Sequence, residues 1–325
     1  MTKAIRASSG TDALRIEDVP TPTPGPDDVR IRVHAAGLNY TDALLVAGLL
    51  PSPAPMFTPG VEVAGVIDAI GSGVSGLRVG QRVVATLPEL GGFAEEAIAA
   101  ASRVVGIADS LAFERAVAVP VLAPTTLLVL RASRLAAGET LFVPSAAGAA
   151  GTLLVQLAKR VFGAKVVAGA SSEEKRELAL GLGADIAVDT SHASWSERVR
   201  EGTAGRGADV VLLREGGDVP AASLRALGFR GRLVVFGVDN MFDTAFTKEQ
   251  VGSLLAQNQA VIGVATFSLP EAEVQAAVRE VLELVERGVI EPVVSHVVEL
   301  AEVRRAMHDL RERRTSGKVV VRVRA

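Results

Sequence analysis

Residues 140–151 read TLFVPSAAGAAG, and residues 152–169 continue as TLLVQLAKRVFGAKVVAG. The first four residues form a short apolar run that is typical of a buried strand, and the small residues that follow indicate a tight turn. Leu153, Leu154, Leu157 and Val161 then recur at helical spacing and predict one buried stripe on a helix. The stretch therefore predicts one strand–turn–helix–strand unit with parallel strands.

The same alternation continues to residue 267. Six candidate strands, LFVP, KVVAG, DIAV, DVVLL, RLVVFG and AVIGVATF, are separated by amphipathic helical patterns. This pattern predicts an α/β fold with a doubly wound parallel sheet over residues 116–268. Residues 1–115 contain short strands between turn residues, and the closing strand GKVVVRVRA needs a sheet to join. We therefore predict a second, β-rich domain built from residues 1–115 and 269–325.

Composition limits the possible functions. A chain of 325 residues with 49% hydrophobic residues is long enough for two cores. The net charge of −3, without a basic cluster, argues against nucleic acid and anionic membranes as partners. The chain has no cysteine, which excludes disulfides and metal sites with Cys ligands. No leader pattern opens the chain and no apolar run is long enough to span a membrane, so we predict a cytoplasmic protein with a small-molecule ligand.

The turn at residues 144–151 is a candidate phosphate site. The unpaired N–H groups and the dipole at a helix N-terminus stabilise a pyrophosphate, provided that side chains leave room. Gly148 and Gly151 stand at the second and third glycine positions of the dinucleotide-binding pattern GxGxxG, and Ala146 replaces the first. The alternative is a plain strand–helix connection. The predicted contacts are Ala147, Gly148, Ala149, Ala150 and Gly151.

The end of the next strand bears on the choice of cofactor. An NAD site places Asp or Glu about 20 residues after the start of the motif, whereas this region reads AGASSEEKR. Ser171, Ser172 and Lys175 offer hydroxyl groups and a cation that suit a 2′-phosphate, so we predict NADPH. Ser172 can also be a helix N-cap, and the two roles are compatible.

Taken together, AAGLNYTDALLVAGLLP, PGVEVAGVI, VGQRVVA, GGFAEEA, SAAGAAG, GRLVVFG and GKVVV resemble one family over essentially the whole chain. It is the zinc-independent branch of the medium-chain dehydrogenase/reductase superfamily, and within it the NADPH:quinone oxidoreductases. The resemblance implies a GroES-like β-barrel domain formed by both chain ends around a Rossmann domain. Asn39 and Val61 stand where zinc-dependent relatives have Cys and His ligands. It therefore implies hydride transfer to a quinone or similar conjugated carbonyl without zinc.

The resemblance also assigns roles to individual residues. Tyr40, the only tyrosine, would line the cleft beside the nicotinamide as a catalytic residue, either bonding the developing oxyanion or stacking on the substrate; the alternative is a packing role. Asn39, also predicted to be catalytic, would contact the nicotinamide ribose, and Asp42 would cap the following helix. The remaining predicted cofactor positions are Thr126, Thr190, Phe236, Gly237, Phe267 and Arg313.

Several positions depart from the family pattern. Leu50 replaces a tyrosine that donates a proton in related enoyl-thioester reductases, which disfavours, without excluding, an enoyl or enone reductase. A non-catalytic NADPH-binding protein is the third alternative. Arg214 and Glu215 stand where a strand end approaches the cofactor. The low aromatic content of 4% leaves few flat stacking surfaces beyond Tyr40, Phe57, Phe242 and Phe267, and the four histidines show no spacing typical of a metal site.

The last predicted strand of the parallel sheet, residues 260–267, is long and apolar. A bare edge strand of this kind promotes aggregation. We therefore predict that it pairs with its copy in a homodimer.

Overall fold

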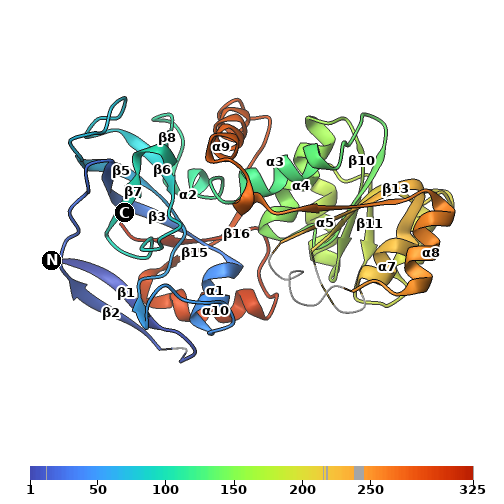
Figure 1. The fold of residues 1–325 in the computed structure, drawn as a ribbon, viewed down its shortest axis with the longest axis horizontal. Helices are drawn as coiled ribbons and strands as arrows, with labels where there is room; N and C mark the ends of the chain where they lie inside the picture. Colours follow the sequence, from blue (N-terminus) through green and yellow to red (C-terminus); the bar gives the residue numbers. More distant parts are fainter. Residues whose placement is uncertain (12, 215, 217–218, 238–244, 325) are drawn as a thin grey trace. The chain divides into compact units, whose positions relative to one another are not determined.

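A computed structural model describes residues 1–11, 13–214, 216, 219–237 and 245–324 (Figure 1). The chain forms two compact units. The first comprises Met1–Leu122, Val278–Arg287 and Pro292–Ala325, and the second comprises Ala123–Ala277 and Gly288–Glu291. Helix α9 (Glu271–Glu286) contributes residues to both units.

The second unit is built on a six-stranded sheet in the order β11-β10-β9-β12-β13-β14. Every pair in it is parallel, which confirms the predicted doubly wound sheet. The strands are β9 (Thr140–Val143), β10 (Lys165–Ala170), β11 (Ile186–Asp189), β12 (Ala208–Leu213), β13 (Leu227–Phe236) and β14 (Ala260–Val264). The strand order reverses between β9 and β12, and ligands of such sheets bind at the carboxyl ends of the strands at this switch point.

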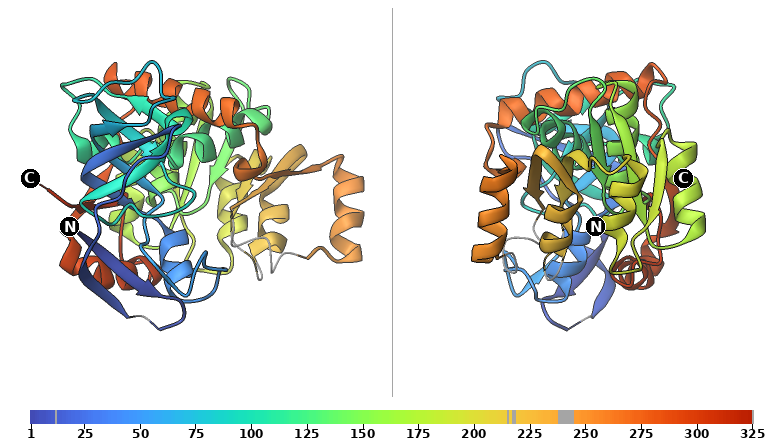
Figure 2. Two further views of the ribbon diagram at one scale, coloured as in Figure 1. Left: turned by 60° about the vertical axis from the view of Figure 1, so that its left-hand side comes forward. Right: turned by 90° about the vertical axis from the view of Figure 1, so that its right-hand side faces the viewer.

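Helices connect these strands: α3 (Leu122–Ala132), α4 (Ala149–Arg160), α5 (Glu173–Gly181), α6 (Trp195–Gly202), α7 (Val219–Ala226) and α8 (Lys248–Gln257). Helix α4 buries Leu153, Leu154 and Leu157 of the predicted stripe, but Val161, its C-cap residue, is 41% exposed, so that part of the prediction is wrong. A second core cluster joins α6 and α7 to the sheet, where the Trp195 ring stacks on Phe142 at a centroid distance of 4.9 Å. Figure 2 shows α6, α7 and α8 in yellow to orange.

The first unit holds two sheets. One has three strands, β1 (Thr2–Ser8), β2 (Leu14–Val19) and β4 (Met56–Phe57), in the order β2-β1-β4. The other has the order β15-β16-β3-β5-β6-β8, with β7 also paired to β3. Its strands are β3 (Asp28–Leu38), β5 (Glu62–Ile70), β6 (Arg82–Thr86), β7 (Glu96–Ala100), β8 (Val104–Gly106), β15 (Val294–Glu299) and β16 (Lys318–Arg322). Because β16 pairs with β3, the prediction that the closing strand joins the N-terminal module is confirmed (Figure 1).

Helices complete this unit: α1 (Tyr40–Val46), α2 (Phe113–Ala116) and α10 (Val303–Arg311). Helix α1 is the helix that Asp42 is predicted to cap. Phe57 is buried in the core, so its prediction as a stacking surface is wrong. None of the helices in the described part of the chain is both long enough and apolar enough to cross a bilayer.

Candidate functional site

The small-residue turn lies between β9 and α4, at the switch point of the sheet. Ser145 has a left-handed backbone with φ of 48°, and Gly148 is the N-cap residue of α4. Within the described residues, the backbone N–H groups of Ala149, Ala150 and Gly151 have no acceptor. Ala147 is buried. The helix therefore presents three unpaired donors and no bulky side chain, which fits a pyrophosphate.

Gly151 is required by packing. A Cβ added there would overlap the Ser145 carbonyl oxygen and lie 2.7 Å from the Ala146 Cα. Real Cβ atoms do not approach backbone so closely, so any side chain would push α4 away from the turn. Glycine is therefore required at the third glycine position of the motif in this chain, because the turn and α4 approach each other closely there.

The end of β10 carries polar groups. Ser172 is the N-cap of α5, and its hydroxyl accepts a hydrogen bond from the Lys175 backbone N–H at 3.3 Å, so the predicted capping role is confirmed. Ser171 is exposed and Lys175 is half-buried. Arg176, which the sequence analysis missed although it follows Lys175 directly, forms a 3.3 Å ion pair with Asp189. This strand end therefore carries two cations and two hydroxyl groups.

Thr126 and Thr190 lie in different surroundings. Thr126 is buried in α3, where its hydroxyl donates to the Ala123 carbonyl at 3.2 Å. Thr190 is half-buried just after β11. Its methyl carbon is 2.7 Å from the position of a Cβ on Gly169, so this threonine packs directly against β10.

Phe236 and Gly237 stand at the carboxyl end of β13. Phe236 is buried, and Gly237 has φ of 86°. The Arg214 Cγ lies 2.9 Å from the position of a Cβ on Gly237, so the arginine stem occupies the space above the glycine. Phe267 is 69% exposed in a 3₁₀ turn beyond β14, so its placement in an eight-residue strand is wrong. Glu215 and Phe242 lie outside the described residues.

In the first unit, Tyr40 is the first residue of α1 and is half-buried. Among the residues that the structure describes, its hydroxyl has no hydrogen-bond partner. A packing role with the hydroxyl bonded to a carbonyl is therefore not what the structure shows.

Asn39, immediately before Tyr40, belongs to a buried polar cluster with Glu62 and Lys318. The Lys318 ammonium lies 2.5 Å from Glu62 Oε1 and 2.7 Å from Asn39 Oδ1. Asn39 Nδ2 donates to Glu62 Oε1 at 2.7 Å. Glu62 and Lys318 were not predicted as site residues from the sequence. The available signal was one charged residue of each sign inside the apolar runs GVEVAGV and GKVVV.

Asp42 lies beside this cluster and is fully buried. It accepts hydrogen bonds from the backbone N–H groups of Asn39 at 2.8 Å and Gly60 at 3.1 Å, which confirms its predicted capping role. Burial raises the pKa of the Asp42 carboxyl to about 7, although the two hydrogen bonds and the nearby Lys318 ammonium oppose the rise.

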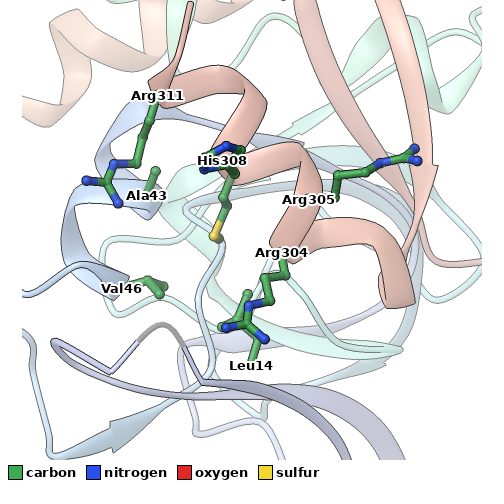
Figure 3. A pocket seen from close by; sticks show the side chains of 8 residues that line it. Leu14, Ala43, Val46, Arg304, Arg305, His308 and Arg311 are labelled. Atoms are coloured by element: carbon green, nitrogen blue, oxygen red, sulfur yellow. The ribbon is translucent and has the colours of Figure 1, made fainter. Parts of the chain in front are cut away.

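Arg313, a predicted cofactor position that the resemblance assigns to the 2′-phosphate, is exposed just after α10 and has a left-handed φ of 56°. Near it in the chain, α10 borders a pocket of about 380 Å³ that none of the predicted site residues lines (Figure 3). Apolar side chains of β2 and α1, among them Leu14 and Val46, and basic side chains of α10 surround this pocket. In Figure 3, Arg305 points away from it.

Comparison with known proteins identifies the family. Residues 25–109 match the family described as alcohol dehydrogenase GroES-like domain, and residues 149–287 match the zinc-binding dehydrogenase family. The quinone oxidoreductase of Pseudomonas aeruginosa is 36% identical, with 99% of each chain covered. The chain belongs to the quinone oxidoreductase family of the medium-chain dehydrogenase/reductase superfamily.

Solved structures of this family agree. The quinone oxidoreductase of Pseudomonas syringae pv. tomato DC3000 has a TM-score of 0.89 and 31% identity, covering 99% of this chain and 100% of its own. The quinone oxidoreductase of Thermus thermophilus, whose structure was also solved in complex with NADPH, has a TM-score of 0.84 and 34% identity, with the same coverage. The family and the fold predicted from the sequence are confirmed.

The zinc in the description of the matched family does not fit the residues of this chain. Zinc sites of this kind use Cys and His ligands, and the chain has no cysteine. Asn39 stands at one of the ligand positions, and its carboxamide oxygen is already bonded to the Lys318 ammonium. In the described part of the chain, no three His, Asp or Glu side chains gather in an arrangement that could hold a metal ion. The donor set therefore does not suit zinc.

Proposed function

We propose that the chain is an NADPH-dependent oxidoreductase that transfers hydride to a quinone or a similar conjugated carbonyl without zinc. The observation that carries the proposal is the start of α4, where three unpaired N–H groups face the switch point of a parallel sheet. The second unit is the proposed cofactor-binding unit and the first is the proposed catalytic unit. The relatives named quinone oxidoreductases support the reaction class.

NADPH is the proposed cofactor because a relative was solved with it and because the residues present suit it. The turn of residues 147–151 would hold the pyrophosphate. Ser171, Ser172 and Lys175 at the end of β10 would hold the 2′-phosphate, where an Asp or Glu would repel it. When bound, the cofactor supplies a hydride.

Tyr40 is the proposed contact for the acceptor oxygen. Addition of a hydride to a quinone or a conjugated carbonyl leaves a negative charge that is delocalised onto an oxygen. This oxygen must then take up a proton. A phenol can donate that proton or stabilise the developing negative charge, and solvent is the alternative proton source. The Tyr40 hydroxyl suits this role because no described residue bonds to it.

The activity is tested by following NADPH oxidation with 1,4-benzoquinone and 9,10-phenanthrenequinone as acceptors. The proposal expects turnover with both and little with crotonyl thioesters or alkenals. Preference for the thioesters or alkenals would favour an enoyl or enone reductase, and tight NADPH binding without any turnover would favour a non-catalytic role. Comparison with Tyr40→Phe then shows whether the phenol or solvent supplies the proton.

Cofactor selectivity has its own test. Lys175→Ala should weaken NADPH binding about tenfold, as expected for loss of one charge-assisted phosphate contact, and leave NADH binding unchanged. Lys165→Ala is a matched control because Lys165 is an exposed lysine at the opposite end of β10. An unchanged NADPH affinity in Lys175→Ala would show that the 2′-phosphate lies elsewhere.

We further propose a homodimer that forms through β14. This strand is at the end of the described six-stranded sheet, and its burial pattern is largely exposed. The preceding helix α8 has no buried residue, and its Leu255 is 82% exposed. A bare parallel edge with apolar residues beside it is suited to pairing with a second copy. The cytoplasmic setting stays a prediction.

A further inference from the structure

The polar cluster around Asn39 is built from three strands that the sheet brings together. Strand β3, which leads into Asn39, lies between β16, which begins with Lys318, and β5, which begins with Glu62. All three side chains are buried; Asn39 is 8% exposed and the other two at most 1%. Gly37 on β3 leaves room for the Glu62 side chain to reach Lys318 on the other side of β3, because a Cβ on residue 37 would lie 2.7 Å from Glu62 Cδ.

The two charged groups fix the orientation of the Asn39 carboxamide. Its Nδ2 donates to Glu62 Oε1 at 2.7 Å and to the Gly37 carbonyl at 3.3 Å, and its Oδ1 accepts from Lys318 at 2.7 Å. A flipped carboxamide would place its oxygen against a carboxylate and its N–H₂ group against an ammonium. Both contacts would be repulsive between buried groups, so one orientation is strongly favoured.

This orientation limits what Asn39 can offer to a ligand. Both Nδ2 hydrogens are used inside the cluster, and the backbone N–H is bonded to the Asp42 carboxylate. The Asp42 backbone N–H, which belongs to the same capping box, donates to the Asn39 carbonyl oxygen at 3.1 Å, so Lys318 is the one described donor to Oδ1 and one lone pair of Oδ1 remains. Asn39 can therefore accept a hydrogen bond from a ligand but cannot donate one. The carbonyl oxygen or oxyanion of a substrate therefore cannot be the hydrogen-bond partner of Asn39, because it has no hydrogen to donate. A ribose hydroxyl can donate one and is suitable.

We propose that Glu62 and Lys318 are positioning residues that hold Asn39 as a hydrogen-bond acceptor for a hydroxyl of the nicotinamide ribose. The inference rests on the proposed function, since it takes NADPH as the ligand. It sharpens the predicted contact of Asn39 with the nicotinamide ribose to a hydrogen bond that Asn39 accepts, so that Asn39 orients the cofactor and does not stabilise charge on the substrate. Glu62 Oε2 also accepts a hydrogen bond from the Val121 backbone N–H at 2.9 Å, and in this proposal neither Glu62 nor Lys318 contacts the cofactor directly.

The experiment compares two cofactors. NADPH and an NADPH analogue that lacks both hydroxyl groups of the nicotinamide ribose are titrated against the wild type and against Asn39→Ala, Lys318→Met and Glu62→Gln. Loss of one neutral hydrogen bond corresponds to about a three- to tenfold change in Kd. The wild type should bind NADPH more tightly than the analogue by this factor, and all three variants should bind the two cofactors equally.

The ratio of the two Kd values separates positioning from general structure. A purely structural loss weakens both cofactors equally and leaves the ratio unchanged, and this result in Lys318→Met and Glu62→Gln would overturn the proposal. Lys3→Met, which changes an exposed lysine of β1 in the same unit, should retain the wild-type ratio. If neither single variant folds, the double variant Glu62→Gln/Lys318→Met decides the question, because it buries no charge and lacks both charged groups that orient the carboxamide.

Failure of the underlying function gives a different result. A wild type that binds neither cofactor would refute NADPH binding itself. A wild type that binds both equally would leave NADPH binding intact and overturn only the role assigned to Asn39.

Discussion

Glu62 and Lys318 form a buried ion pair, with 2.5 Å between Glu62 Oε1 and Lys318 Nζ, although they are 256 positions apart in the chain. Their strands, β5 and β16, flank β3 on either side. Gly37 on β3 has no side chain that would separate them. The last strand of the chain, β16, is thus held in the N-terminal sheet by this ion pair as well as by backbone hydrogen bonds to β3.

Removing one partner of this pair should destabilise the first unit strongly. Lys318→Met leaves the Glu62 carboxylate buried without a counter-ion, and breaking a buried pair in this way costs about 3–5 kcal/mol. The double variant Glu62→Gln/Lys318→Met buries no charge and should recover much of that loss. Equilibrium unfolding in urea measures the free energy of unfolding of the single and the double variant. A Lys318→Met variant as stable as the exposed-site control Lys3→Met would contradict the expectation.

Asp42 should make the stability depend on pH. Its folded-state pKa of about 7 lies above the ordinary value of 3.8, so the protonated carboxyl favours the folded state. That contribution is complete below about pH 3.8 and is lost as the pH rises through about 7. Between these values it should lower the free energy of unfolding by at most about 1.4 kcal/mol per pH unit.

Asp42→Asn separates this effect from the hydrogen bonds. The single carboxamide oxygen of the variant can accept from one of the two backbone N–H groups, so at pH 5 the variant should be less stable than the wild type by about 1–3 kcal/mol. The difference should shrink as the pH is raised to 8, because a carboxamide does not ionise. Unfolding curves at pH 5, 6, 7 and 8 test this, with Asp27→Asn as an exposed control. A difference that stays constant with pH would show that Asp42 does not titrate in this range.

The sequence predicted those parts of the structure that depend on local pattern. The strand, turn and helix of residues 140–160 follow from apolar periodicity and small residues, and the parallel sheet follows from their repetition. The cluster around Asn39 was missed for a physical reason. Glu62 and Lys318 are each a single charge in an apolar run, but whether these two charges meet depends on the order and register of β3, β5 and β16. The end of β14 was also misplaced, because GVATF is equally apolar in the strand and in the 3₁₀ turn that follows.

Gly151 provides a test of the cofactor turn. The added Cβ in Gly151→Ala would overlap the Ser145 carbonyl, so α4 must shift and its N–H groups must move. We expect a loss of about 1–3 kcal/mol in stability and weaker NADPH binding. Gly181→Ala, at the end of α5 with no heavy atom within 4 Å of its Cβ, should change neither by a comparable amount. Unchanged NADPH affinity in Gly151→Ala would show that the start of α4 does not bind the pyrophosphate.

The proposed dimer is tested by placing a charge on its edge strand. Val261 on β14 is 39% exposed, and in Val261→Lys the pairing of two copies would bring like charges together and desolvate them. Light scattering after size-exclusion chromatography should show a dimer for the wild type and a monomer for the variant. Val297 on β15, the end strand of the other unit's larger sheet, is equally exposed at 40%, and Val297→Lys should remain dimeric. A monomeric wild type would exclude the dimer, and a dimeric Val261→Lys together with a monomeric Val297→Lys would move the interface from β14 to β15.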